Sequence, residues 1–140
     1  MIKPSIKSFI IADLVMQEKT TNKWSIVGIF DKILVRNFPS IHPSLSIYMR
    51  LTEAEGDYDI RVEFCDINKK KLAIFEGLKL SVPSKLMSPE IGIKTSSLPI
   101  PQPGKYLFNL YFNNEFLETH PIWIEQIETK NVLGDDKYDK

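Results

Sequence analysis

Apolar and polar residues alternate along most of this chain. In the segment 45–52 every second residue is apolar, and the positions between carry Ser, Tyr, Arg and Thr. The segment 58–66 repeats the pattern. Because successive side chains of a strand point to opposite faces, a period of two predicts β-strands with one buried face. The residues expected to face inward are Leu45, Ile47, Met49, Leu51, Tyr58, Ile60, Val62 and Phe64.

The segment 101–117 predicts a sharp turn followed by a β-hairpin. Pro101 and Pro103 keep the approach extended, and Gly104 supplies the turn. Alternation then resumes up to Asn113-Asn114, a dipeptide suited to a two-residue type I′ turn because asparagine tolerates positive φ. The expected cross-strand pairs are Phe112 with Glu115, Tyr111 with Phe116, and Leu110 with Leu117, with Phe108, Leu110 and Leu117 pointing inward.

Tyr106 has two interpretations at the start of this hairpin. Gly104-Lys105-Tyr106 resembles the beginning of the strand that carries the tyrosine corner of immunoglobulin-like sandwiches, where a tyrosine hydroxyl bonds the backbone a few residues upstream. The alternative is an ordinary core aromatic whose hydroxyl reaches water.

Further strands are expected at 6–15, 24–30, 33–36, 71–82 and 91–98, and a last one at 121–127. The proline-rich segment 38–43 is expected to be a loop. Pro121 must interrupt a hydrogen-bond ladder, so the last run is predicted to be an edge strand or one that changes sheet. Eight or nine short strands without a long helix predict an all-β, antiparallel, two-sheet β-sandwich of immunoglobulin-like architecture.

Length and charge narrow the class of protein. The 140 residues predict one domain over 1–128 followed by a polar, flexible tail over 129–140. Eighteen basic and eighteen acidic residues give no net charge, so the basic footprint of a nucleic-acid-binding protein is missing. A single cysteine allows no internal disulfide and fits a reducing compartment. No apolar run suits a signal peptide or a membrane span, so we expect a cytoplasmic location and no membrane partner.

The usual catalytic patterns are missing from the sequence, which contains no phosphate-binding glycine loop, nucleophile elbow or zinc-protease motif. His42 and His120 each precede a proline. Zinc needs three or four converging ligands, and these histidines could join Cys65 only if the fold brought the three together by coincidence. The neighbouring carboxylates Glu63 and Asp66 raise a thiol pKa, so we interpret Cys65 as inert.

Two acidic features of the sequence are candidate functional sites. The acidic segment 53–59 could supply calcium ligands, but calcium needs six to eight oxygens around one point, and a solvated hairpin tip is the simpler interpretation. Asp13 interrupts the apolar run 10–15. It is interpreted as an outward residue or a carboxylate that holds a neighbouring turn, with a recognition role as the alternative. We therefore expect no catalytic residue, no cofactor and no metal site.

Surfaces are the remaining candidates for function. Tyr48 and Arg50 fall on the outward side of their strand, and Tyr111 and Phe116 form an outward pair on the last hairpin. Protein interfaces favour aromatic residues and arginine, so these four residues are the candidate interface. The alternative is that they are isolated surface aromatics, which need no explanation.

Two segments together resemble a family of small uncharacterised bacterial proteins. The resemblance extends in order over most of residues 6–127. It implies a bacterial immunoglobulin-like β-sandwich domain and brings no activity and no catalytic residues. The residues that carry it are Ser25-Ile26-Val27-Gly28-Ile29-Phe30-Asp31-Lys32-Ile33 with Phe38-Pro39 and His42-Pro43, and Leu98-Pro99-Ile100-Pro101-Gln102-Pro103-Gly104-Lys105-Tyr106-Leu107-Phe108 with Asn114-Glu115.

These observations favour a non-catalytic protein-binding module, either an adaptor or a subunit of a larger bacterial assembly, which binds another protein or its own copies. The alternative is a binder of small ligands such as carbohydrates, which would stack on Tyr48, Trp24 or Trp123. A third hypothesis, from the enzyme class, is weak hydrolysis that uses His42 or His120.

Overall fold

All of the regular secondary structure in the described residues is β-strand. The computed structural model describes residues 2–128, and within this range the chain forms eleven strands and no helix. Their bounds are β1 (Ser5–Gln17), β2 (Trp24–Ile29), β3 (Lys32–Val35), β4 (Ser40–His42), β5 (Ser46–Thr52), β6 (Gly56–Asp66), β7 (Lys71–Val82), β8 (Glu90–Lys94), β9 (Leu98–Ile100), β10 (Gly104–Phe112) and β11 (Glu115–Gln126). The predicted tail over 129–140 lies outside the described residues.

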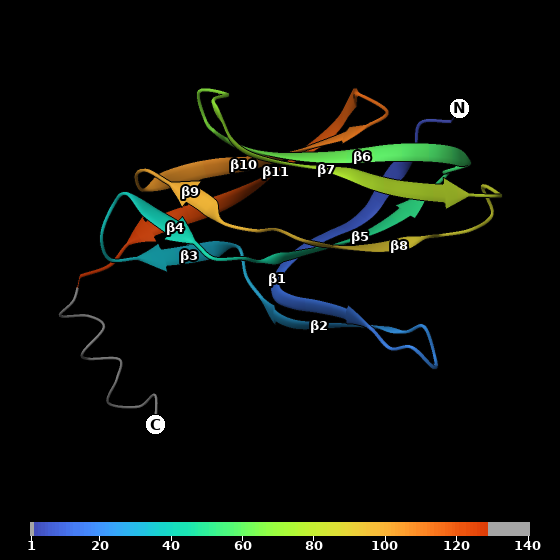
Figure 1. Cartoon of the computed structure of the whole chain (residues 1–140), viewed down its shortest axis with the longest axis horizontal. Helices are drawn as coiled ribbons and strands as arrows, with labels where there is room; N and C mark the ends of the chain where they lie inside the picture. Colours follow the sequence, from blue (N-terminus) through green and yellow to red (C-terminus); the bar gives the residue numbers. More distant parts are fainter. Residues whose placement is uncertain (1, 129–140) are drawn as a thin grey trace.

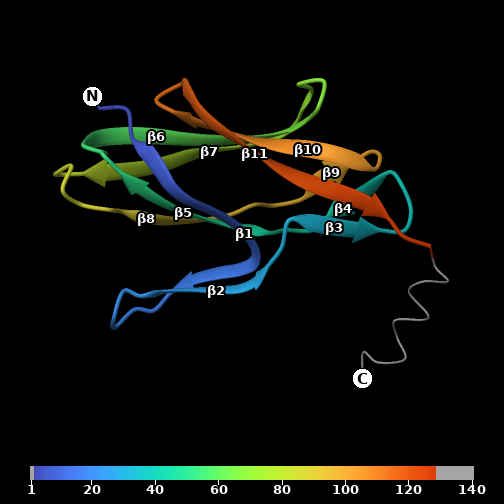
Figure 2. The same ribbon diagram turned by 180° about the vertical axis from the view of Figure 1, so that it is seen from behind.

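Two sheets form a sandwich, as predicted (Figures 1 and 2). One sheet has the order β2-β1-β5-β8 and the other β3-β11-β10-β6-β7, while β4 and β9 form a small sheet of their own. The expected eight or nine strands become eleven because the segment 38–43 contains β4, and the run 91–98 divides into β8 and the start of β9. One pair also departs from the antiparallel rule, since β3 runs parallel to β11.

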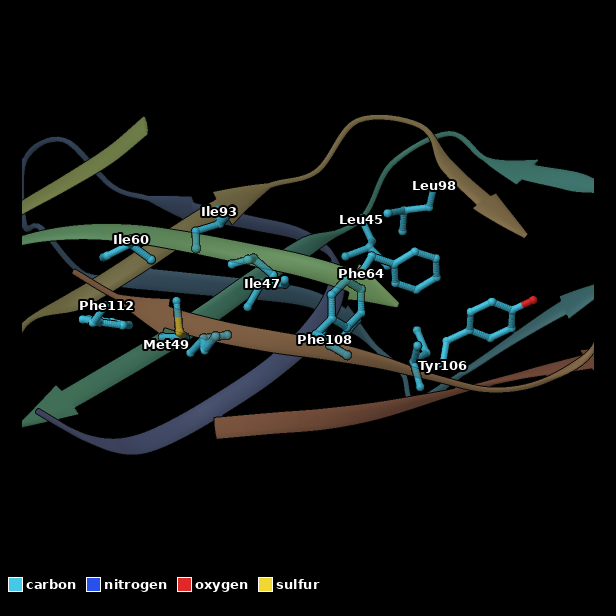
Figure 3. Packing of buried hydrophobic residues seen from close by; sticks show 14 of the residues in the cluster. Leu45, Ile47, Met49, Ile60, Phe64, Ile93, Leu98, Tyr106, Phe108 and Phe112 are labelled. Carbon is cyan, nitrogen blue, oxygen red and sulfur yellow. The ribbon is translucent and has the colours of Figure 1, made fainter. Parts of the chain in front are cut away.

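The core lies between the inward faces of β5 and β8 on one side and of β6 and β10 on the other (Figure 3). The eight residues predicted to face inward on β5 and β6 or just before β5 are all buried. At the centre of the second sheet, the Phe64 ring lies 5.3 Å from the Tyr106 ring and 5.1 Å from the Phe108 ring. The period of two therefore identified the core correctly.

The β10–β11 hairpin has the predicted turn. Asn113 and Asn114 have φ values of 53° and 68°, as a type I′ turn requires. The pairs nearest the turn are the predicted ones, but a register shift after Leu110 places this residue opposite Glu118 and not Leu117. Leu117 is consequently only partly buried, although it still packs against the core.

Tyr106 forms a tyrosine corner, which confirms the first of its two interpretations. Its hydroxyl donates to the Gln102 carbonyl oxygen at 2.5 Å and lies 3.2 Å from the Gln102 amide nitrogen, which donates back. Burial is the main cause that raises the pKa of Tyr106 above its usual value. The phenol thus remains a neutral hydrogen-bonding group at any physiological pH.

The prediction for the strand after Pro121 was wrong on both alternatives. β11 is one continuous strand that lies between β10 and β3, so it is neither an edge strand nor a strand that changes sheet. Pro121 pairs with Leu107 of β10, whereas the ladder between β11 and β3 begins two residues later, at Trp123. The proline, which has no N–H to donate, therefore stands before the point where the second ladder starts.

Candidate interaction surface

Tyr48 is not part of an exposed surface, and its prediction as an interface residue is corrected. It lies on the outward side of β5, but its exposure is only 7%. The ring meets Trp24 edge-on, with ring centroids 5.9 Å apart, and its hydroxyl donates to the Glu90 carboxylate. Burial, followed by the bond to Glu90, raises the pKa of Tyr48 to about 12. Arg50, opposite Glu90 in the ladder, is exposed as predicted.

The cover over Tyr48 is the far half of the β1–β2 hairpin. β1 pairs with β5 up to Ala12 and with β2 from Ala12 onward, and the hairpin then extends across the outer side of β5 and β8 (Figure 1). Contact is close at Gly92, where an added Cβ would lie 2.7 Å from Trp24 Cζ3 and 3.2 Å from Val15 Cγ1. The β1–β2 hairpin therefore forms a local third layer that packs directly against Gly92 of β8.

The other face of the β1–β2 hairpin is apolar and exposed. Leu14 of β1 lies opposite Val27 of β2 in the ladder. Met16 follows Leu14 by two residues in β1, and Ile29 follows Val27 by two residues in β2. Side chains at such positions share one side of the ribbon. We call these four residues the hairpin face, and their exposed fractions are 42% for Leu14, 46% for Met16, 52% for Val27 and 67% for Ile29.

Asp13 is exposed at the base of this hairpin, beside Gly28 of β2, and its charge acts on His42. An added Cβ at Gly28, which has a φ of +72°, would lie 2.4 Å from an Asp13 carboxylate oxygen, so the carboxylate rests on the glycine. The exposure of Asp13 agrees with its interpretation as an outward residue. Burial lowers the pKa of His42, and the negative charge of Asp13 partly offsets that shift. The His42 ring also lies 6.3 Å from the Phe30 ring.

A surface hollow of about 460 Å³ adjoins the hairpin face. Its walls include Ile29, Phe9, Phe30 and His120, and Asp31 stands at its side. The imidazole of His120 lies flat on the Phe9 ring, with centroids 3.8 Å apart, and its Nε2 is 2.8 Å from a Glu118 carboxylate oxygen. The hollow is therefore mainly apolar, with one polar edge.

Tyr111 and Phe116 form the outward pair that the sequence predicts. Their rings meet edge-on at 5.7 Å, and the Arg61 guanidinium lies 4.2 Å from the Tyr111 centroid. Phe116 is 49% exposed, whereas Tyr111 is half-buried. Arg61 also donates to Glu63 at 2.9 Å and to Asn114. This cluster is a smaller and more polar surface than the hairpin face.

Alternation places Cys65 on the outward side of β6, beside charged residues, but its side chain is only 2% exposed. Burial, with the Glu63 charge second, raises the pKa of the Cys65 thiol, as the inert interpretation requires.

Within residues 2–128 no group of three or more histidine, cysteine, aspartate or glutamate side chains could hold a metal ion. In the acidic segment, Asp57 bonds Ser81 at 2.8 Å and Asp59 pairs with Lys79.

Sequence reasoning missed the hairpin face, although a signal was present. The run Ile10–Met16 is apolar on both of its faces apart from Asp13, and the run Ser25–Ile29 contains no charge. A sandwich strand needs only one apolar face. When both faces of consecutive strands are apolar, the second face is either covered by another layer or exposed as an apolar surface. In the β1–β2 hairpin one face is covered by β5 and β8, and the other is exposed. Of the other proposed ligand-stacking residues, Trp24 packs on Tyr48, and Trp123 is exposed beside Lys105.

The two sheets, the parallel β3–β11 pair and the tyrosine corner define an immunoglobulin-like β-sandwich. The chain belongs to the family of unknown function DUF6941, which it matches over residues 7–125. No curated protein matches it in sequence. Among the described residues, no helix is long and apolar enough to cross a membrane.

Several solved structures are similar to this chain at low sequence identity. The Pseudomonas fluorescens alkylpurine DNA glycosylase AlkC, bound to DNA containing an abasic site analog, has a TM-score of 0.54 at 10% identity, over 87% of this chain and 30% of its own. This chain therefore spans about a third of that protein, and the likeness concerns the fold alone. A β-glucosidase from Listeria innocua (TM-score 0.46, 9% identity, 91% and 16% covered) and an immunoglobulin-like protein from Pseudomonas aeruginosa (0.42, 12%, 88% and 97%) are also similar.

Proposed function

We propose that this domain is a non-catalytic protein-binding module and that the hairpin face is its main contact surface. The observation that carries the proposal is the grouping of Leu14, Met16, Val27 and Ile29 on one side of an exposed hairpin. Contiguous apolar patches on soluble domains mark interaction sites more often than scattered apolar residues do. The module would act as an adaptor or as a subunit of a larger bacterial assembly.

The position of the face supports a protein partner over a small molecule. The face extends over β1 and β2, and β2 is an edge strand with β1 as its one neighbour among the described residues. An edge strand offers backbone N–H and C=O groups, which another polypeptide can pair with while its side chains contact the apolar face. Flat aliphatic surfaces contact proteins well, whereas small ligands need enclosure.

The test compares two variants that add charge at equally exposed apolar positions. Leu14→Lys with Met16→Lys changes the hairpin face, and Ile74→Lys changes β7 in the other sheet, where Ile74 is similarly exposed. Each is measured by circular dichroism, light scattering and co-purification with proteins of the source lysate. We expect the face variant to lose its associations while folding normally, and Ile74→Lys to keep them. Equal association by both variants would overturn the proposal.

The hollow beside the face supports a second candidate function, the binding of a small molecule with an apolar body. Ile29, Phe9 and Phe30 would contact such a ligand, and His120 would supply the polar group. A thermal-shift panel of carbohydrates and aromatic compounds tests this directly, because a ligand that binds the native state raises the unfolding temperature. Stabilisation that Phe9→Ala abolishes would support the candidate, and a panel without any stabiliser would count against it.

A further inference from the structure

We propose that the hollow beside the hairpin face binds small aromatic amines, with the ring of the ligand against Phe9 and Phe30 and its positive charge facing the Asp31 carboxylate. This inference rests on the second candidate function above, the binding of a small molecule with an apolar body, and names the class of ligand. The composition of the walls, the bonds that hold them and the charge that they carry all favour this class.

The walls of the hollow come from both sheets. β1 contributes Phe9 and Ile11 from one sheet, and β11 contributes His120 and Pro121 from the other. A third wall is the link Phe30-Asp31, where the chain passes from β2 in the first sheet to β3 in the second (Figure 2). The hollow therefore lies at a flank of the sandwich, where β1 and β11 do not pair with each other. Its volume of about 460 Å³ is within the usual range of small-molecule sites, roughly 300–1,000 Å³.

Backbone hydrogen bonds hold the link between the sheets at both of its residues. The Phe30 amide donates to the Ile11 carbonyl oxygen at 3.0 Å, and the Trp123 amide donates to the Asp31 carbonyl oxygen at 3.0 Å. The Phe9 ring is held by its stacking on an imidazole, with centroids 3.8 Å apart. A ligand would thus meet walls that are already in place, which lowers the entropic cost of binding.

The charge at the hollow is negative. Asp31 is exposed, and its carboxylate forms no salt bridge within the described part of the chain, since the neighbouring Lys32 pairs with Glu125 at 3.0 Å. Among the described residues, neither lysine nor arginine lines the hollow. His120 is paired with Glu118, whose negative charge balances any proton that the imidazole gains. A cation at Asp31 is therefore attracted, whereas an anion there is repelled.

The apolar lining favours a flat ring over a carbohydrate. Asp31 and His120 are the polar side chains of the described lining, and its other six residues are apolar. A sugar has hydroxyl groups on every side, and each one that loses water without gaining a partner costs free energy. An aromatic ring has no such groups and packs well against the Phe9 and Phe30 rings. An ammonium group near these rings is also attracted by their π faces.

Three indoles that differ mainly in charge test the ligand class. Tryptamine, tryptophol and indolepropionate carry an ammonium, a hydroxyl and a carboxylate group on the same side chain. Amide shifts in NMR titrations of the isotope-labelled chain measure each dissociation constant and locate the site. We expect tryptamine to bind about threefold to fivefold more tightly than tryptophol, and indolepropionate to bind most weakly. Equal affinities, or shifts that lie away from Phe30 and Asp31, would overturn the proposal.

A neutral side chain at position 31 removes the charge and keeps the shape. We expect Asp31→Asn to bind the three indoles with similar affinity, because the amide attracts an ammonium group less than a carboxylate does. Asp57→Asn, which neutralises an exposed carboxylate outside the hollow, is the matched control and should keep the order of the unchanged chain. The NMR spectra also report whether each variant is folded. A preference for tryptamine that survives in Asp31→Asn would show that this carboxylate does not select the ligand.

The failure of this inference differs from the failure of the candidate function on which it rests. If tryptamine and indolepropionate bind equally and Phe9→Ala abolishes both, the hollow binds apolar molecules and the charge selection is wrong. If none of the three indoles binds at millimolar concentration, the aromatic amines are the wrong class. A carbohydrate that stabilises the chain and loses its effect in Phe9→Ala would then still support the candidate function.

Discussion

The β10–β11 and β1–β2 hairpins carry similar apolar residues in opposite environments. Phe108 and Leu110 of β10 are fully buried, whereas Val27 and Ile29 of β2 are more than half exposed. β10 lies inside its sheet, between β11 and β6, and its inner face meets β5 across the sandwich. β2 lies at an edge, and only the opposite face of its hairpin is covered. Alternation thus separates the two faces of a strand, and the opposing layer decides which face is buried.

The comparison is tested most strongly by truncating one residue of each hairpin. Phe108→Ala removes a ring from the centre of the core, and we expect it to lower the free energy of unfolding by about 3–5 kcal/mol. Val27→Ala removes only exposed methyl groups, so its expected effect is below about 0.5 kcal/mol. Urea unfolding followed by circular dichroism measures both. Similar losses would show that the β1–β2 hairpin is packed more tightly than the structure indicates.

A smaller effect is expected at the base of the β1–β2 hairpin. Gly28→Ala places a Cβ on a residue with positive φ and against the Asp13 carboxylate. We expect a loss of about 1–3 kcal/mol, from backbone strain and from this contact. Adding Asp13→Ala should recover the steric part and leave the backbone part. If Gly28→Ala unfolds at the same urea concentration as the unchanged chain, the carboxylate is not seated on the glycine.

The start of the β10–β11 hairpin offers a milder change. Tyr106→Phe removes the hydroxyl that bonds both backbone groups of Gln102. The expected loss is about 1–2 kcal/mol, because a hydrogen bond disappears and two backbone groups lose a partner. Tyr111→Phe, on the outward side of the same strand, is the matched control. Equal stability of the two variants in urea would mean that the corner contributes nothing.

The smallest predicted effect is a pH dependence at His42. Burial lowers the pKa of this imidazole below its usual 6.5, so the unfolded chain binds the proton more tightly than the folded chain does. The contribution of His42 to stability is therefore complete above pH 6.5 and decreases as the pH falls through and below that value. Unfolding at several pH values should show this decrease, and His42→Gln should lack it. An identical slope in both chains would contradict the prediction.

The sequence predicted the parts of the fold that depend on local chemistry. The inward faces of β5 and β6 follow from alternation, and the turn at Asn113-Asn114 follows from tolerance of positive φ. The corner at Tyr106 depended on a resemblance to a known local motif, and the structure has it.

What could not be predicted depends on long-range placement. Tyr48 faces outward by parity, yet a hairpin from residues 13–28 covers it, and no local pattern specifies where that hairpin lies. The sequence predicts an edge strand or a change of sheet after Pro121 because it cannot show that the second ladder begins only at Trp123. The hairpin face could not be predicted for the same reason. Whether Leu14 or Val15 is covered depends on which side of the β1–β2 hairpin packs on β8, and the sequence does not specify this.

The position of the two ends has a mechanical consequence. The first residues of β1 and the last residues of β11 lie at opposite ends of the long axis (Figures 1 and 2). A force that pulls the two ends apart would slide β1 along β5, and β11 along β10 and β3, parallel to the strands. Hydrogen bonds of a ladder loaded in this direction share the force and do not open one at a time. The domain would therefore transmit tension along its length as a stiff link.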